Sequence, residues 1–298
     1  MKTTHCASLC LALLLFACEE GDSEASQLER PRVLGVRFEV RDDPQRASPE
    51  AGEEVDIRWL VRGPKGAAEV DYVLSACAST GRSSGLPACS GPVFSQAHDR
   101  GEQPTLSLRV PVDYSAAQDG GKPILLAGAM CEHGEASFDL RSMLGRCEGS
   151  AEVPETFSAY LDVGEDNLNP DLQGASLTFA GESWPETTAL PCPELSSPAK
   201  GPVAIELRLS ASARETVASM TEPLRVTQFT TLGAFSRLFS LVDPESPAPR
   251  VELAWSPPKI PKGEGEDMRV MVVVRDQRGG TSWFERCALW RPEAKGEE

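Results

Sequence analysis

Short stretches of alternating hydrophobic and polar residues recur along the whole chain. In residues 55–62, for example, Val55, Ile57 and Trp59 share one face, and charged residues occupy the other. A period of two is typical of a β-strand with one buried face. The first half of the chain contains strand-like segments at 32–40, 55–62, 70–77, 105–112, 124–131 and 156–163. Turns rich in Gly, Pro and Ser separate them, so the pattern predicts a β-sandwich over residues 31–163.

A second set of strand patterns follows a gap that has no apolar face. The gap, residues 164–171, carries turn-forming residues throughout, and we interpret it as a linker between two domains. The strand patterns beyond it lie at 175–180, 203–210, 224–231, 235–242, 251–255, 268–275 and 282–290. They predict a second sandwich over residues 172–292, followed by a disordered tail at 293–298. Only residues 114–119 and 139–146 could form short helices, so the predicted fold class is all-β with two tandem β-sandwich domains.

The first residues have the features of an export signal. Lys2 is followed by an apolar run over residues 9–17. A helix that spans a membrane needs about 20 apolar residues, so this run is too short to stay in a bilayer. We therefore expect residues 1–17 to be removed as a signal peptide. Residues 18–30 are polar and lack periodicity, and we expect them to form a flexible tether.

The signal ends in Leu15, Phe16, Ala17 and Cys18. This ending resembles the signal of bacterial lipoproteins, in which a Leu three residues before a Cys and a small residue just before it direct lipidation of that Cys. The resemblance implies that acyl chains on Cys18 anchor the protein to a membrane. Phe16 departs from the family pattern, which usually has a small residue there. Glu19 stands where enteric inner-membrane lipoproteins carry Asp, which favours the outer membrane. The alternative is an ordinary secretory signal that is cleaved elsewhere.

Composition narrows the function classes. The chain of 298 residues holds 45 Asp and Glu against 29 Lys and Arg, which gives a formal net charge of −16. Proteins that bind nucleic acids neutralise phosphates with basic patches, so this balance argues against a nucleic-acid partner. Hydrophobic residues make up 40% of the chain, which is enough to build a globular core.

Cysteine usage agrees with export. Two cysteines leave with the signal and Cys18 is assigned to the anchor, so an even number remains: Cys77, Cys89, Cys131, Cys147, Cys192 and Cys287. An even number in an exported chain predicts disulfides, whose connectivity the count alone leaves open. Zinc binding would need closely spaced cysteine pairs or nearby histidines, and the spacing of these cysteines does not provide them.

The second half carries motifs of a known family. A Trp-Ser-Pro-Pro run at 255–258 precedes the strand pattern 268–275, and Asp276, Gly279 and Gly280 follow that strand. This resembles the immunoglobulin-like modules of bacterial surface proteins, in the group that includes PKD and cadherin-like repeats. Their last two strands are joined by an Asp-x-x-Gly-Gly turn. The resemblance, which is weaker in the first half, implies two tandem Ig-like sandwiches and a role in binding, adhesion or spacing.

The Ig-like arrangement also predicts the disulfides. Cys77 and Cys131 each end a predicted strand, which would be the third and sixth strands of such a sandwich. These strands lie side by side and run antiparallel, so their C-terminal ends are too far apart for the Cα separation of about 5.5 Å that a disulfide requires. Each should therefore pair with the next cysteine along the chain, and the other two should join the first and last strands of the second domain. The predicted pairs are Cys77–Cys89, Cys131–Cys147 and Cys192–Cys287.

Oxygen-bearing side chains cluster at the predicted domain junction. They are Asp162, Glu165, Asp166, Asn167, Asn169 and Asp171. Calcium takes six to eight hard oxygen ligands, and this stretch loosely resembles the calcium-binding linker of cadherins. Leu168 departs from that pattern, because an acidic residue is expected there. The alternative is a linker whose Asp and Asn side chains cap their own backbone.

One motif could carry hydrolytic chemistry. Gly81, Ser83 and Gly85 match G-x-S-x-G, and His98 and His133 follow in the chain. A nucleophile elbow needs a strand before the Ser and a helix after it, whereas this motif lies in a short loop between two cysteines. We therefore assign no catalytic residue and no cofactor other than the candidate calcium.

These observations together predict a non-enzymatic, lipid-anchored protein of the cell envelope. It would bind or scaffold an unknown protein or glycan partner through Ig-like sandwiches. The two alternatives are an envelope hydrolase on an all-β scaffold and an adhesin that calcium stiffens.

Overall fold

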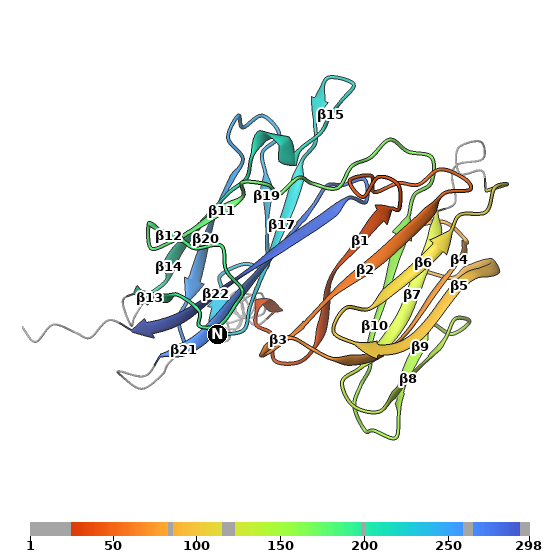
Figure 1. Ribbon diagram of the computed structural model, residues 1–298, viewed down its shortest axis with the longest axis horizontal. Coiled ribbons are helices and arrows are strands. Elements are labelled where there is room, and N and C mark those ends of the chain that lie inside the picture. The colour runs from red at the N-terminus through yellow and green to blue at the C-terminus, as the bar shows by residue number, and fades with distance from the viewer. Residues whose placement is uncertain (1–24, 83–85, 115–122, 198–200, 259–264, 293–298) are drawn as a thin grey trace, which may run out of the picture.

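The protein is built from two β-sandwiches that lie side by side (Figure 1). The computed structural model describes residues 25–82, 86–114, 123–197, 201–258 and 265–292. The predicted all-β fold class is confirmed, because strands form both sheets of each sandwich. Within the described residues, no helix is long and apolar enough to span a membrane.

The first sandwich has the strand order of an Ig-like domain. One sheet contains β1 (Arg32–Val40), β2 (Glu54–Gly63), β3 (Gly66–Ala67) and β6 (Thr105–Arg109). The facing sheet has the order β10 (Glu155–Leu161), β7 (Ile124–Cys131), β4 (Val70–Ser79) and β5 (Cys89–Gly101). In immunoglobulin lettering, β1, β2 and β6 are strands A, B and E, with the short β3 beside B. The facing strands β10, β7, β4 and β5 are G, F, C and C′. Immunoglobulin-like sandwiches divide their strands between two layers in this way.

The alternating pattern of the sequence explains the core of this sandwich. Ile57 on β2, Leu74 on β4 and Leu126 on β7 are fully buried between the sheets. Trp59 joins them, with its ring centroid 5.6 Å from that of Phe157 on β10. Burial of each large apolar side chain contributes about 1.5–3 kcal/mol to folding, so the two sheets hold each other through these faces.

The second sandwich repeats the plan with more strands. Its first sheet has the order β12 (Glu182–Trp184), β11 (Ser176–Phe179), β14 (Val203–Arg208), β20 (Arg250–Ser256) and β18 (Ala234–Phe235). Its second sheet has the order β13 (Glu194–Ser197), β22 (Thr281–Pro292), β21 (Glu266–Arg275), β17 (Leu224–Thr230) and β19 (Phe239–Val242). The short strand β13 runs parallel to β22, the last strand. A small hairpin, β15 (Thr216–Val217) and β16 (Met220–Thr221), projects beyond the sheets (Figure 1).

Tryptophans fill the core of the second sandwich. Trp184, Trp255 and Trp290 are almost completely buried. The Trp255 ring lies between Phe179 and Trp290, at centroid distances of 5.8 and 5.4 Å. The Trp255 indole also donates a hydrogen bond of 2.8 Å to the carbonyl of Leu232. These rings therefore hold the domain together and are not available at the surface.

The turn between β21 and β22 has the geometry that its sequence motif predicts. Gly279 adopts φ +112°, a conformation that disfavours other residues. The Asp276 carboxylate accepts hydrogen bonds from the backbone amides of Arg278 and Gly280, at 2.7 and 2.8 Å. A Cβ atom at position 280 would lie 2.1 Å from that same carboxylate, so glycine is needed there.

An apolar cluster joins the two sandwiches. Its members come from the outward faces of β1 and β2, from β17 and β21, and from the segment before β1. They are Leu28, Leu34, Leu60, Phe229, Met271 and Val273, with Leu238 and Trp283 packed against them. Met271 and Val273 are completely buried, although they lie on the outer face of their own sandwich. The second sandwich therefore uses both faces of this sheet, one for its own core and one for its neighbour.

Polar contacts surround this apolar cluster. The Arg62 guanidinium on β2 lies 2.8 Å from the Glu285 carboxylate on β22, which also accepts from Arg269 at 2.7 Å. Arg275 donates to the carbonyl oxygen of Leu34 on β1. Loss of solvation on burial lowers the pKa of Arg275 to about 10, so it stays charged at neutral pH. Charge-assisted bonds of this kind fix the orientation of the two sandwiches.

Residues 164–171 connect the sandwiches, and part of this segment is buried. Asn167 and Asn169 are only 2% and 3% exposed. The Asn169 side chain donates to the carbonyl of Phe38 at 2.7 Å and accepts from the amide of Thr281 at 3.0 Å. Side chains that suit a turn also suit buried hydrogen bonding, and sequence pattern alone cannot separate the two uses.

The expected tether is shorter than residues 18–30. Ser26 and Leu28 are buried, and Leu28 belongs to the apolar cluster between the sandwiches. The amide of Leu28 bonds to the carbonyl of Thr230, and the Ser26 hydroxyl accepts from the amide of Phe235, both at 2.9 Å. One buried leucine is too weak a pattern to reveal this packing from sequence. Residues 1–24, with Cys18, and the tail 293–298 lie outside the described residues.

Two segments of the first sandwich differ from expectation. Strand β5 occupies a region with no strand pattern, because most of its side chains are exposed. Residues 139–146, one of the two stretches that could have been helical, instead form part of a hairpin of β8 (Glu135–Asp139) and β9 (Leu144–Glu148). Met143 takes φ +57° in its turn, which a helix would not allow. The expected helix at 114–119 falls almost entirely outside the described residues.

We predict that Asn169→Ala lowers the free energy of unfolding by roughly 2–3 kcal/mol, because it leaves the Phe38 carbonyl and the Thr281 amide buried without partners. Urea denaturation measures the change. Leu168→Ala is the matched control, since Leu168 is 36% exposed and should lose far less. Equal losses in the two variants would show that Asn169 does not hold the sandwiches together.

Candidate binding pocket beside the Cys131–Cys147 disulfide

The structure contains the three disulfides that the strand order predicts. They join Cys77 to Cys89, Cys131 to Cys147 and Cys192 to Cys287. Strands β4 and β7 are antiparallel neighbours, with Asp71 opposite Cys131 and Cys77 opposite Leu125. Cys77 and Cys131 therefore lie toward opposite ends of the sheet, which is the reason that each bonds locally.

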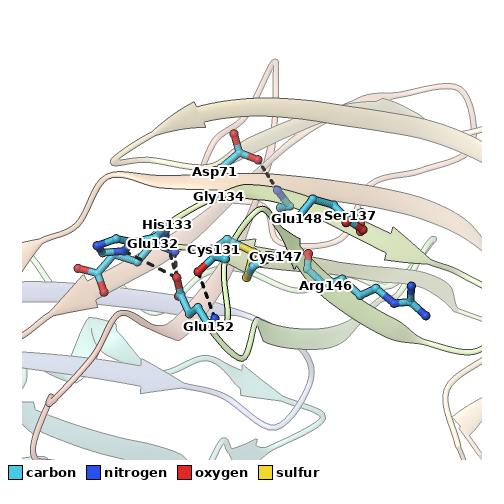
Figure 2. The surroundings of a disulfide bond; sticks show 12 residues. Asp71, Cys131, Glu132, His133, Gly134, Ser137, Arg146, Cys147, Glu148 and Glu152 are labelled. Atoms are coloured by element: carbon cyan, nitrogen blue, oxygen red, sulfur yellow. Dashed lines mark hydrogen bonds and ion pairs between the residues drawn. A yellow bond between two sulfur atoms is a disulfide. The ribbon is translucent and has the colours of Figure 1, made fainter.

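The Cys131–Cys147 disulfide holds the β8–β9 hairpin against the outer face of its sheet (Figure 2). Ala136 of the hairpin is buried in a small apolar cluster with Val73 and the two cysteines. The Asp71 carboxylate on β4 accepts a hydrogen bond of 2.6 Å from the amide of Ala136. The disulfide, this apolar cluster and the hydrogen bond together fix the hairpin at the end of β7.

Glu152 orders the loop that follows β7. Its carboxylate accepts from the backbone amides of Glu132 and His133, at 3.0 and 2.8 Å, as Figure 2 shows. The His133 imidazole also lies 3.7 Å from this carboxylate. Hydrogen bonds to an ionised acceptor are stronger than neutral ones, so one side chain holds the turn in a defined shape.

A pocket of about 710 Å³ opens beside this loop, at the end of the first sandwich. We call it the end pocket. Its floor is apolar and consists of core residues from both sheets, namely Val33, Val61, Val70 and Met130. Its rim is polar and charged, with Arg30, Arg32, Glu132, His133, Ser150, Glu152 and Glu155. Small-molecule and peptide sites commonly combine an apolar floor with a few polar groups at the rim, and the volume suits such a ligand.

The rim charges are largely paired. The Arg30 guanidinium lies 3.5 Å from the Glu155 carboxylate across the pocket mouth. Arg32 donates to the carbonyl of Ala25 at 2.9 Å and stacks over the Phe229 ring of the second sandwich, 5.7 Å from its centroid. These pairs hold the charged side chains of the rim in place. A ligand would therefore gain most by covering the apolar floor and removing it from water.

No residue of this pocket was singled out by sequence except His133. The floor residues are ordinary core positions, and only the end of the sandwich leaves them partly open. The signals that could have indicated the pocket are the Cys131–Cys147 pair, which marks an ordered loop, and Val153, which is 73% exposed beside it.

The residues expected to bind calcium are dispersed among other partners. The Asp162 carboxylate lies 2.6 Å from Arg82, and Asp171 accepts from Ser212 at 2.9 Å. The nitrogen and the oxygen of the Asn169 side chain both form hydrogen bonds with backbone groups. Glu165 is exposed and contributes only its backbone amide, which donates to the Ser48 hydroxyl. Within the described ranges, no group of three or more His, Cys, Asp or Glu side chains is placed to hold a metal ion.

Arg278 provides the positive charge at this junction. Its guanidinium donates to the side-chain oxygen of Asn167 at 2.6 Å and to the carbonyl of Asp166 at 2.7 Å. It also pairs with Glu215 and Glu222 at 2.9 and 2.6 Å. Sequence reasoning missed Glu215 and Glu222 because they lie far along the chain, on either side of the β15–β16 hairpin.

The residues of the G-x-S-x-G motif do not form a described site. Ser83 and Gly85 lie outside the described residues. His98 on β5 lies 3.2 Å from Asp71, and His133 faces Glu152. In the described part of the chain, neither imidazole hydrogen-bonds to a hydroxyl group, so no nucleophile and base are brought together there.

Comparison with known proteins adds little to this picture. No family model matches the sequence, and no curated protein matches it. Among solved structures, red sea bream transglutaminase is 12% identical, with a TM-score of 0.26 over 90% of this chain and 32% of its own. Collagen adhesin from S. aureus is 8% identical, with a TM-score of 0.21 over 86% of this chain and 92% of its own. This chain spans about a third of the transglutaminase. Scores this low support no statement about function.

We predict that Glu152→Gln loosens the loop after β7, because an amide side chain has one acceptor oxygen where the carboxylate has two. Hydrogen exchange at the amides of Glu132 and His133 should become faster, and the free energy of unfolding should fall by about 1 kcal/mol. Glu148→Gln, on the exposed strand β9, is the control and should leave these two amides unchanged. Unchanged exchange in the Glu152 variant would mean that the disulfide alone orders the loop.

The buried Glu222 predicts a dependence of stability on pH. Loss of solvation on burial, and then the charge of Asp276, raise the pKa of Glu222 above its ordinary value of 4.5. The folded state therefore binds this proton more tightly than the unfolded state, so stability falls as the pH rises from about 4.5 through the raised pKa. Glu222→Gln removes this cost, and its melting temperature at neutral pH should exceed that of the unmodified protein. Melting curves between acidic and neutral pH measure this, with the exposed Glu182→Gln as control. A less stable Glu222 variant would show that the ion pair with Arg278 outweighs the cost of burial.

Proposed function

We propose that this protein is a lipid-anchored, non-catalytic protein of the cell envelope that binds or scaffolds a protein or glycan partner. The observation that carries the proposal is a packed pair of disulfide-bonded sandwiches with an open, apolar-floored pocket. Three disulfides are typical of extracellular or envelope proteins, because reducing compartments keep thiols free. Ig-like sandwiches serve many functions, so the argument depends on the site and not on the fold.

The packing of the N-terminal segment bears on the proposed anchor. Ala25 is the first described residue, and the chain from there to β1 contacts the second sandwich. Cys18 and Ala25 are separated by six residues, and this stretch spans at most about 25 Å when extended. A lipid on Cys18 would therefore keep the sandwiches close to the membrane surface. The residue after Cys18 is Glu19, and we propose the outer membrane as the location.

The second candidate function is that of a hydrolase, and the G-x-S-x-G motif is the feature that supports it. A fluorophosphonate probe that labels Ser83 would support this alternative and contradict the non-catalytic proposal. We expect no labelling, because the described residues after the motif lead into strand β5 and not into the helix that positions such a serine in hydrolases.

We predict that Cys18 is acylated and is the first residue of the mature protein. Mass spectrometry of the N-terminal peptide should show the acyl mass, and Cys18→Ser should move the protein from the membrane fraction to the soluble fraction. A Ser substitution at the signal residue Cys10 is the matched control and should leave the protein anchored. A mature N-terminus elsewhere, or an unmodified Cys18, would exclude lipid anchoring.

A further inference from the structure

Strand β10 has one free edge. Its seven residues pair with β7, from Glu155 opposite Met130 to Leu161 opposite Ile124. On its other side, no strand pairs with it within the described chain. Natural proteins usually protect such edges with proline, lysine or a bulge, and β10 has none of these.

A groove of about 440 Å³ follows this free edge, and we call it the edge groove. Residues 33–36 and Phe38 of β1 form one wall, and residues 155–160 form the other. Arg275, Gly279 and Thr281 of the second sandwich also line it. The edge groove shares Val33 and Glu155 with the end pocket, so the two hollows adjoin.

The two walls of the edge groove differ in their hydrogen-bond partners. On the β1 side, the Leu34 carbonyl accepts from Arg275 and the Phe38 carbonyl accepts from Asn169. Arg275 of the second sandwich and Asn169 of the connecting segment therefore cap two carbonyls of the β1 edge, whereas no described strand pairs with the outer edge of β10. A binding segment would pair with β10 and lie beside β1.

The second sandwich shows what fills the equivalent position. Its last strand, β22, pairs with the short parallel strand β13, from Glu194 opposite Leu289 to Ser197 opposite Pro292. Strand β10 is likewise the last strand of its sandwich, but the described residues supply no counterpart of β13. In the second sandwich, β13 thus occupies the position beside the last strand. In the first sandwich, the edge groove lies at that position.

We propose that the edge groove binds an extended segment of a partner polypeptide, which adds to β10 as a further strand. The pairing of β13 with the last strand of the second sandwich is the observation that indicates a strand as the occupant. The centre of the groove carries small or polar side chains such as Thr156, Ser158 and Thr281, so backbone hydrogen bonds provide most of the recognition there. At the Glu155 end, an apolar side chain of the segment enters the end pocket. This inference rests on the proposed binding function and specifies its site and partner class.

A displayed library of random peptides of about ten residues tests the inference on the full-length protein. The length allows a segment to span the whole of β10. We expect enriched peptides with an apolar residue at one end of an alternating stretch. Hydrogen exchange should show fast amides among residues 155–161 in the free protein and slower ones when a peptide is bound.

Substitutions on β10 locate the binding site. Ser158 is exposed, and Ser158→Lys places a charge of the kind that protects natural edges, so peptide affinity should fall roughly tenfold. Ser158→Pro, which disturbs the strand itself, should abolish binding. Ser176→Lys, on an exposed position of β11 in the second sandwich, is the matched control and should bind normally. Melting curves show whether each variant is folded, and Ser158→Lys remains informative if Ser158→Pro is not.

Four outcomes would overturn the inference. Slow exchange at 155–161 in the free protein would mean that another part of this chain already covers the edge. A dimer that Ser158→Lys dissociates would assign the edge to a second copy. Peptides that bind the Ser158→Lys and Ser176→Lys variants equally, and that protect amides outside 155–161, would place binding elsewhere. That result would leave the proposed function intact. A library without enriched peptides would exclude peptide binding by this groove.

Discussion

The packing of β1 against the outer face of β21 and β22 is the constraint on which the rest of the structure depends. Met271 and Val273 point away from the core of their own sandwich, and they would expose an apolar face if the first sandwich were absent. Asn167 and Asn169 of the connecting segment and Leu28 of the N-terminal segment are buried beside this contact. The same contact caps the edge of β1 and provides one end of the edge groove.

The sequence pattern predicts the strands that bury one face, and for a clear physical reason. A strand between a core and solvent needs alternation, so β6 and β10 of the first sandwich are recognisable from the chain alone. Strand β5 is not, because it is held by backbone pairing with β4 while most of its side chains are exposed. The β8–β9 hairpin is not, because a disulfide and a hydrogen bond to Asp71 hold it, and these leave no hydrophobic period. The disulfide pairs follow from strand direction, which is a property of the fold class.

The candidate sites depend on contacts between distant segments, and these are the least visible in a sequence. Asn169 and Asn167 resemble calcium ligands when only their neighbours are considered. In the structure their oxygens accept from Thr281 and Arg278, more than a hundred residues away. The end pocket is hidden from sequence for the same reason, since its floor consists of ordinary core residues such as Val61 and Met130.

The attachment of the N-terminal segment has a mechanical consequence. Gln27 forms a parallel bridge with Thr230, and Leu28 is buried beside Phe229, so the start of the chain is fastened to the second sandwich. A pulling force applied at the N-terminus would be resisted first by these contacts, and would then pass to β17 as well as along the backbone into β1. Tension would thus be shared between the two sandwiches from the outset, and they would be loaded side by side instead of one after the other.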